Sequence, residues 1–166
     1  MRKIDLREIT EADVALLYRL YQDKSSMRYF GRAPSQSEQE VADVIAENLN
    51  WRTEKIGVRY LAFDGVHFLG FISLKRYDTR FQRAEIDYII APEVRQQGFG
   101  TRILQAFLQR AFVEWRLARL SAYVNPENLP SQKLLEKCGF QREGLLKNWD
   151  GIDGDCYIYG FTKESK

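Results

Sequence analysis

Histidine and cysteine are scarce in this chain, and their scarcity excludes several kinds of catalytic site. Among its 166 residues there are one histidine, His67, and two cysteines, Cys138 and Cys156. One histidine is too few for an HExxH zinc motif, or for any metal site that takes two histidine ligands from one chain. A Ser-His-Asp triad would have to use His67, but His67 follows Asp64-Gly65 at an expected hairpin turn, and no Gly-x-Ser-x-Gly motif is present. The cysteines lie far apart and fit no CxxC spacing, so we expect neither a metal site nor a disulfide framework.

Long apolar runs and a large charge of one sign are missing as well. No stretch approaches the roughly 20 apolar residues that span a bilayer. The first residues, Met1-Arg2-Lys3-Ile4-Asp5, are not followed by the apolar segment of a signal peptide. The net charge is only +2 and the basic residues are scattered, whereas nucleic-acid binders usually cluster them. We therefore expect one cytoplasmic domain, residues 1–166, that binds neither nucleic acid nor membrane.

Apolar periodicity divides the chain into seven expected strands and four expected helices. Helical spacing follows two capping boxes, Thr10 to Asp13 and Ser35 to Glu38, and recurs over residues 101–116 and 128–137. Strand patterns cover residues 3–8, 57–63, 68–75, 81–90, 120–124, 141–148 and 155–162. This order predicts an α/β protein of the α+β kind, with one mixed sheet and helices on both faces. The strands at 81–90 and 120–124 flank a helix as a βαβ unit, so they should be parallel.

A glycine-containing turn between the strand at 81–90 and the long helix predicts an anion site. It reads Arg95-Gln96-Gln97-Gly98-Phe99-Gly100. The two glycines let a ligand approach the backbone, and the helix start offers free N–H groups and the positive end of the helix dipole. A pyrophosphate suits such a site. The turn lacks the third glycine of a dinucleotide-binding fingerprint and the Gly-Lys pair of a P-loop.

Several motifs along the chain resemble those of one family. Pro92-x-x-Arg95-x-x-Gly98-x-Gly100 is similar to the acetyl-CoA loop of the GNAT superfamily of N-acetyltransferases. Three further segments resemble its RimJ/RimL-like branch, which acetylates N-terminal amines of ribosomal proteins: residues 83–90, Asn125-x-x-Asn128-x-x-Ser131, and residues 135–144. The resemblance implies a GNAT-like acyl-CoA N-acyltransferase fold with acetyl-CoA as cosubstrate. It also implies direct transfer of the acetyl group to a primary amine in a ternary complex.

The resemblance also assigns the cofactor contacts to named residues. The sheet should open after the strand that ends near Ile90, so that the pantetheine arm pairs with the backbone of Tyr88, Ile89 and Ile90. Asn128 and Ser131 match positions near the pantetheine and the thioester sulfur. The positive charge of Arg95 should lie beside the pyrophosphate. The pyrophosphate itself should rest on the backbone N–H groups of six residues: Gln96, Gln97, Gly98, Phe99, Gly100 and Thr101.

Two residues are candidates for proton transfer. Glu85 and Asp87 alternate along one strand and share a face, so if both line the site, their repulsion should raise the pKa of one of them. By analogy with the family, Glu85 is the candidate base; the alternative is that both are surface carboxylates. Ser131 is the candidate donor to the leaving thiolate, and its alternative is an ordinary polar residue in a first helical turn. Many family members carry a tyrosine that acts as the general acid at the position where this chain has Leu135. A tyrosine acid is therefore absent at the usual position.

The acceptor stays open at this level. The favoured function is acetylation of a protein N-terminal amine, with a ribosomal protein as partner. A small amine such as a polyamine or an antibiotic, a non-catalytic acyl-CoA sensor, and an unrelated ligand are the alternatives. The oligomeric state is open too, a homodimer included. The loop residues Phe30, Trp149 and Asp150 either line the acceptor site or form a satellite cluster, and the cluster is favoured.

Overall fold

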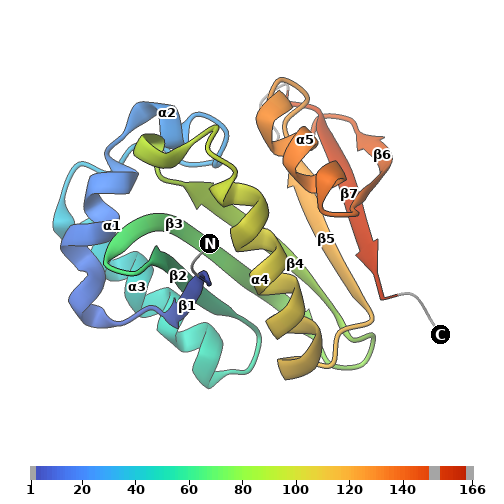
Figure 1. The fold of residues 1–166 in the computed structure, drawn as a ribbon, viewed down its shortest axis with the longest axis horizontal. Coiled ribbons are helices and arrows are strands. Elements are labelled where there is room, and N and C mark those ends of the chain that lie inside the picture. Colours follow the sequence, from blue (N-terminus) through green and yellow to red (C-terminus); the bar gives the residue numbers. More distant parts are fainter. Residues whose placement is uncertain (1–2, 150–153, 164–166) are drawn as a thin grey trace.

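One sheet of seven strands runs through the computed structural model, which describes residues 3–149 and 154–163 (Figure 1). The strand order is β1-β2-β3-β4-β5-β7-β6, and every neighbouring pair is antiparallel except β4 and β5. The predicted mixed sheet and its parallel βαβ pair are therefore confirmed. The strands are β1 (Asp5–Glu8), β2 (Val58–Asp64), β3 (His67–Asp78), β4 (Arg83–Ile90), β5 (Arg119–Val124), β6 (Gln141–Leu146) and β7 (Cys156–Thr162).

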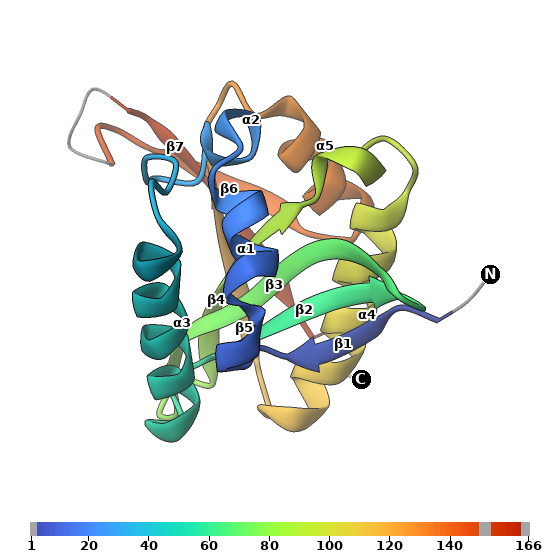
Figure 2. The ribbon, with the colours of Figure 1, turned by 90° about the vertical axis from the view of Figure 1, so that its left-hand side faces the viewer.

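Helices cover both faces of this sheet. Helices α1 and α3 lie on one face and α4 on the other (Figure 2). The bounds are α1 (Val14–Tyr21), α2 (Lys24–Met27), α3 (Glu38–Thr53), α4 (Phe99–Glu114) and α5 (Leu129–Lys137), with short 3-10 turns at Glu11–Asp13 and Pro92–Val94. The four predicted helices are confirmed, but α2 is an additional single turn that the sequence interpretation missed. Among the residues described, no helix is long and apolar enough to cross a membrane.

The sheet separates two hydrophobic cores. On one face, Leu104 and Phe107 of α4 are buried against Leu120 of β5. On the other, Val41 and Ile45 of α3 are buried with Phe71 of β3. Side chains alternate between the faces of a strand, so each strand of the centre contributes to both cores.

The helix caps are partly as predicted. Thr10 and Asp13 form the expected capping box, in which Thr10 N–H donates to the Asp13 carboxylate at 2.8 Å. The box predicted at Ser35 to Glu38 is wrong, because α3 is capped by Ser37, whose hydroxyl accepts from the N–H of Glu40. Ser35 is buried two residues earlier in the chain.

We expect Gly70→Ala to destabilise the fold strongly. Gly70 has a φ of +128°, and a Cβ atom there would lie 2.0 Å from the carbonyl oxygen of Ile89. Since that oxygen belongs to the backbone of β4, relief requires the two strands to move apart. We expect a loss of about 2–4 kcal/mol of unfolding free energy. In a thermal melt this lowers the midpoint by roughly 4–16 °C.

Gly144→Ala is the matched control for this substitution. Its Cβ atom would meet only the side chain of Ile158, at an ordinary 3.7 Å. Equal melting temperatures for the two variants would contradict the close approach of β3 and β4 at Gly70.

Candidate active site

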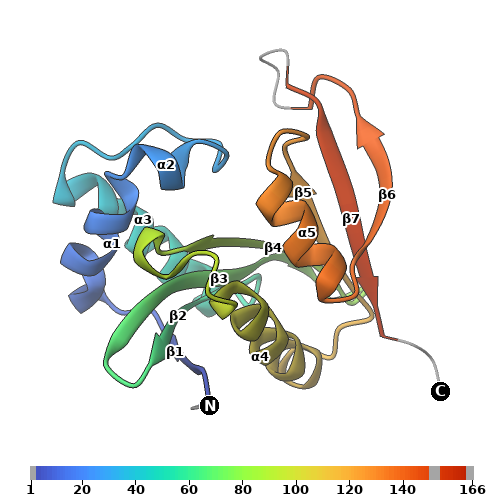
Figure 3. The ribbon, with the colours of Figure 1, turned by 45° about the horizontal axis from the view of Figure 1, so that its top comes forward.

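Strands β4 and β5 pair for a short distance and then separate. Arg83 to Ile86 pair in parallel with Arg119 to Ala122, whereas the rest of β4 pairs only with β3. The last residues of β5 likewise pair only with β7. The divergence of the two strands is visible in Figures 1 and 3, with α2 on one side of it and α5 on the other.

The strand register decides which backbone groups face this opening. The N–H of Ala91 donates to the carbonyl of Leu69 at 2.9 Å. Because bonding direction alternates along an antiparallel ladder, Ile89 also points its N–H and C=O at β3, while Tyr88 and Ile90 point theirs at the open side. The backbone of Ile89 is used by β3 and its side chain is 5% exposed in the core, so the strand register does not favour the pantetheine contact predicted for Ile89, and that contact stays a prediction. Tyr88 and Ile90 keep the predicted orientation.

The turn from β4 into α4 offers a row of unpaired backbone donors. Gln96 and Gly98 have left-handed φ angles of +60° and +82°, and Gly98 is the N-cap of α4. Within the described residues, no N–H from Gln96 to Thr101 has a protein acceptor, and donation resumes with Arg102 to the carbonyl of Gly98. Free N–H groups at the positive end of a 16-residue helix form an anion cradle. The residues present thus fit the predicted pyrophosphate.

Gly100 holds this cradle close to its neighbours. A Cβ atom at Gly100 would lie 3.1 Å from the side chain of Leu134 in α5 and 3.5 Å from that of Ile90. The start of α4 therefore packs directly against α5 and the end of β4. The side chain of Gln97 turns back to donate to the carbonyl of Glu93 at 2.9 Å, which leaves its backbone exposed. Phe99 packs at the edge of the core, under the guanidinium of Arg102.

Arg95 has a different role from the predicted one. Its guanidinium donates to the carbonyl of Ile90 at 3.0 Å, to the Ser25 hydroxyl at 3.0 Å and to the Ser26 hydroxyl at 2.7 Å. These bonds attach α2 to the end of β4 and turn the donors away from the cradle. We therefore assign Arg95 to the positioning of α2 and β4. Its positive charge makes a secondary contribution to the binding of an anion.

The N-terminus of α5 places Ser131 beside Tyr88. Asn128 is the N-cap of α5, and its side chain accepts from the N–H of Ser131 at 3.3 Å. The hydroxyls of Ser131 and Tyr88 are 2.7 Å apart and hydrogen-bonded. Burial raises the pKa of Tyr88, and the bond to Ser131 offsets part of that rise. The phenol is therefore protonated at neutral pH and can donate to Ser131.

The tyrosine hydroxyl at this site was missed by the sequence interpretation. Tyr88 was assigned only a backbone contact, and the search for a tyrosine acid ended at Leu135. Leu135 is fully buried in the core beneath α5. The two residues of the hydroxyl pair are 43 positions apart on different elements, so no local pattern links them.

Glu85 and Asp87 share one face of β4, as predicted, but each is paired with cations. Burial alone would raise the pKa of Asp87, yet Arg59, Lys75 and the Ser73 hydroxyl hold it below its ordinary value. Lys75 Nζ lies 2.8 Å from the Asp87 carboxylate and Arg59 lies 3.6 Å from it. The expectation that repulsion would raise its pKa is therefore wrong for Asp87.

Glu85 is paired less tightly. Its carboxylate is 18% exposed and lies 3.1 Å from Nη1 of Arg76, a side chain that is itself 70% exposed. An exposed partner of this kind is screened by water and contributes little to holding the carboxylate. Glu85 is thus the more available of the two carboxylates.

The aromatic loop residues divide between two places. Phe30 packs on Phe71, with ring centroids 5.6 Å apart, at the edge of the hydrophobic core that α3 forms with the sheet. Trp149 is half exposed and stacks on Tyr123 of β5, with centroids 5.1 Å apart. Asp150 lies outside the described residues.

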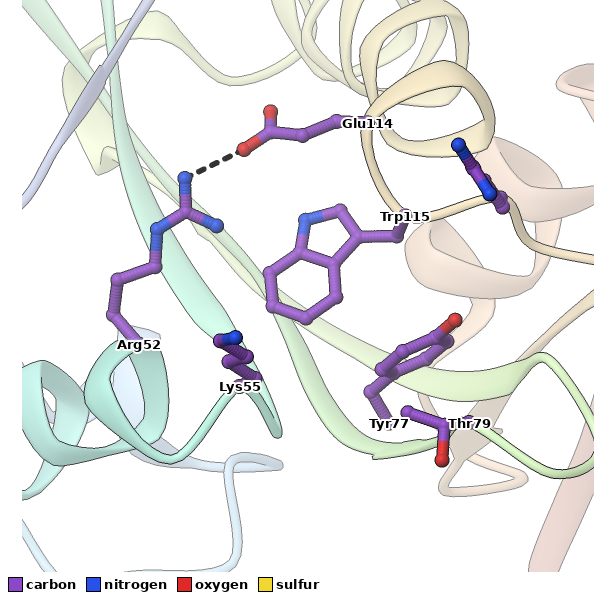
Figure 4. A pocket seen from close by; sticks show the side chains of 7 residues that line it. Arg52, Lys55, Tyr77, Thr79, Glu114 and Trp115 are labelled. Carbon is purple, nitrogen blue, oxygen red and sulfur yellow. Dashed lines mark hydrogen bonds and ion pairs between the residues drawn. The ribbon is translucent and has the colours of Figure 1, made fainter.

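A hollow at the far end of α4 is separate from this site. It measures about 440 Å³ and is lined by Arg52, Lys55, Tyr77, Thr79, Glu114, Trp115 and Arg116. Figure 4 shows the Arg52–Glu114 ion pair above the indole of Trp115. The cofactor cradle is at the other end of the helix, some 24 Å away by helix geometry. In the described part of the chain, no three His, Cys, Asp or Glu residues gather as metal ligands.

The fold and the cradle together define the class of protein. Backbone groups on an unpaired strand edge can bind a pantetheine arm, and the donors at α4 can bind a pyrophosphate. This is the architecture of a coenzyme A-dependent transferase.

Comparison with known proteins identifies the family within this class. The sequence model of the acetyltransferase (GNAT) domain matches residues 3–141, and the chain belongs to this family. The uncharacterised N-acetyltransferase YoaA of Bacillus subtilis is 28% identical over 166 residues, which cover 97% of this chain and 94% of YoaA. The protein is an acetyl-CoA-dependent N-acetyltransferase, and the predicted enzyme class and cosubstrate are confirmed.

Solved structures confirm the fold but differ in their acceptors. A spermidine N-acetyltransferase from Vibrio cholerae, in complex with CoA and spermine, has a TM-score of 0.86 at 23% identity, covering 96% of this chain and 95% of that one. An acetyltransferase from Salmonella typhimurium that modifies the N-terminal serine of ribosomal protein L7/L12 has a TM-score of 0.89 at 19% identity, covering 99% and 97%. At these identities the similarity shows the fold and does not choose between the two acceptors.

We expect Gly98→Val to weaken CoA binding about tenfold or more. A β-branched residue is strongly disfavoured at a φ of +82°, so the turn has to change its conformation and the unpaired N–H groups lose their common direction. The dissociation constant of CoA, measured by calorimetry, reports this loss.

Gly31→Val controls for backbone strain alone. Gly31 also has a positive φ, +76°, and open space where a Cβ atom would stand. Similar losses of CoA affinity in both variants would show that strain, rather than the cradle at α4, controls binding.

Proposed function

We propose that this enzyme acetylates the α-amine of a protein N-terminus by direct transfer from acetyl-CoA. The observation that supports this acceptor is the pairing of Glu85 and Asp87 with cations on the sheet face beside the opening. A polyamine carries several positive charges and requires unpaired carboxylates, whereas a single α-amine does not. Its pKa of about 8 also lies closer to neutrality than that of a lysine amine, so little assistance is needed to deprotonate it.

Backbone N–H groups polarise the thioester in this proposal. The N–H of Ile90 points to the open side of β4 and has no strand partner there. An oxyanion that develops on the thioester carbonyl can accept from it in a site shielded from bulk water. A C–N bond then forms as the C–S bond breaks, and the amine loses one proton while the thiolate gains one.

The hydroxyl pair serves the leaving thiolate. Either hydroxyl can be the donor in this bond; in the proposed arrangement Tyr88 donates to Ser131, so that the Ser131 hydroxyl donates to sulfur. A phenol has a higher pKa than a thiol, about 10 against about 8.5, and burial raises the pKa of Tyr88 further, so neither hydroxyl gives up its own proton. The proton that the thiolate gains is the one that the amine loses, passed on through water. Tyr88 is a positioning residue, and Ser131 is the proposed contact with sulfur.

We expect Ser131→Ala to lower kcat about 10²-fold and to leave the dissociation constant of CoA nearly unchanged. Tyr88→Phe should lower kcat about tenfold, and the double variant should be no slower than Ser131→Ala, because the phenol acts only through the serine. Steady-state kinetics with N-terminal peptides measures all three.

Tyr159→Phe is the matched control, since it removes another tyrosine hydroxyl from a buried side chain, one that donates to the carboxylate of Glu136 and not to Ser131. Losses that add in the double variant would rule out the action of Tyr88 through Ser131.

We propose that Glu85 accepts the proton of the amine, through a water molecule. Glu85→Gln should then lower kcat/KM about 10²-fold at neutral pH, with a smaller loss at high pH, where more of the amine is already neutral. A uniform loss at all pH values would contradict a base role.

Asp87→Asn should instead lower stability. The pKa of Asp87 is lowered in the folded state, so its contribution is present above the unfolded pKa of about 4 and is lost as the pH falls through the folded value. The stability difference between the variant and the natural chain should shrink in urea melts at low pH.

A further inference from the structure

A hollow beside α2 carries an excess of positive charge. It measures about 590 Å³ and is lined by Lys24, Ser25, Met27, Arg28, Arg32 and Pro34. Three of these six lining residues are cations. Lys24 and Arg28 are exposed, while Arg32 is half-buried with its guanidinium 5.2 Å from the ring of Tyr21.

The nearby carboxylates balance only part of this charge. In the described residues, neither Lys24 nor Arg32 forms an ion pair. Arg28 has one partner, Glu127, at 3.8 Å, and both side chains are largely exposed. Asp23 is the N-cap of α2, where it accepts from the hydroxyl of Ser25 and the N–H of Ser26. The hollow therefore favours an anionic ligand.

Arg95 fixes the distance between this hollow and the opening in the sheet. Ser25 lines the hollow and accepts from Arg95, and the same guanidinium donates to the carbonyl of Ile90. The Ser25 hydroxyl and the Ile90 carbonyl are thus separated by one guanidinium and two hydrogen bonds of 3.0 Å. Two or three residues of extended peptide, at about 3.3–3.6 Å each, are long enough to join the two places. Figure 3 shows α2 and α5 on opposite sides of the diverging strands.

We propose that Lys24, Arg28 and Arg32 form an acceptor subsite for acidic side chains at the second to fourth positions of the substrate peptide. This rests on the proposed acetylation of protein N-termini and names the sequences that the enzyme selects. The α-amine enters the opening beside Ile90, and the acidic side chains that follow it lie in the hollow beside α2. The same cations repel polyamines and basic peptides.

The test compares peptides that differ only in charge. One carries Asp and Glu at positions two to four, and its partner carries Asn and Gln there. We expect kcat/KM to be about tenfold or more higher for the acidic peptide at low salt. Near 1 M salt, where the Debye length is about 3 Å, the difference should fall to about twofold.

Charge-removing variants locate the effect. Lys24→Gln combined with Arg32→Gln should lower kcat/KM for the acidic peptide about tenfold and leave the amide peptide within about twofold. Lys55→Gln combined with Arg116→Gln removes the same charge from the hollow at the far end of α4 and should change neither peptide. An unchanged dissociation constant of CoA in each variant establishes that the cradle is intact.

The outcomes separate this subsite from the function on which it rests. If no peptide is acetylated while small amines are, the proposed N-terminal acceptor is wrong. If both peptides are acetylated at equal rates, the acceptor stands and the subsite is overturned. A preference for the acidic peptide that both pairs of variants reduce equally also overturns the subsite, since net charge then explains it.

Discussion

The premature end of the β4–β5 pairing is the constraint on which the rest of the site depends. Had the ladder continued to the end of β4, the backbone groups of Tyr88 and Ile90 would be bonded to β5. The strands cannot simply close, because α5 occupies the space above the opening. Its Leu134 packs on Gly100, and its Ser131 binds the hydroxyl of Tyr88. Side chains on one helix thus keep backbone donors on a strand available for a ligand.

The two carboxylates on the face of β4, Glu85 and Asp87, differ in how firmly cations hold them, and this difference separates a structural role from a chemical one. A buried carboxylate is tolerated only when its partners offset the loss of hydration. Asp87 meets this condition through Arg59, which is 3% exposed, and Lys75, so its geometry is fixed. Among the described residues Glu85 pairs with Arg76, whose side chain is 70% exposed, and it can exchange that partner for water. The sequence placed both residues on one face, but only their neighbours on β2 and β3 distinguish their roles.

Long periodic elements and glycine turns could be predicted from the sequence, whereas tertiary partners could not. The apolar residues of α4 recur at the 3.6-residue spacing of a helix, which can be recognised in the sequence. The glycine at position 98 likewise indicates a left-handed backbone conformation. Helix α2 is a single turn, too short for any period. The cap of α3 was misplaced because Ser35 and Ser37 each begin a Ser-x-x-Glu pattern, and only burial selects between them. The hydroxyl partner of Tyr88 and the guanidinium partner of Asp87 come from other elements, so they depend on how the elements pack together.

Arg95 connects the parts of the protein that we propose bind the cofactor and the acceptor. A one-turn helix such as α2 has no independent stability, so its place depends on the bonds that Arg95 donates to Ser25 and Ser26. The same guanidinium binds Ile90, whose backbone borders the thioester site. Hydrogen bonds from a charged group are each worth about 1.5–3 kcal/mol, enough to hold both elements as one unit. The proposed direct transfer requires reacting atoms to approach within about 3–3.5 Å, and a shared anchor for the proposed cofactor edge and acceptor subsite would provide that precision without a covalent intermediate.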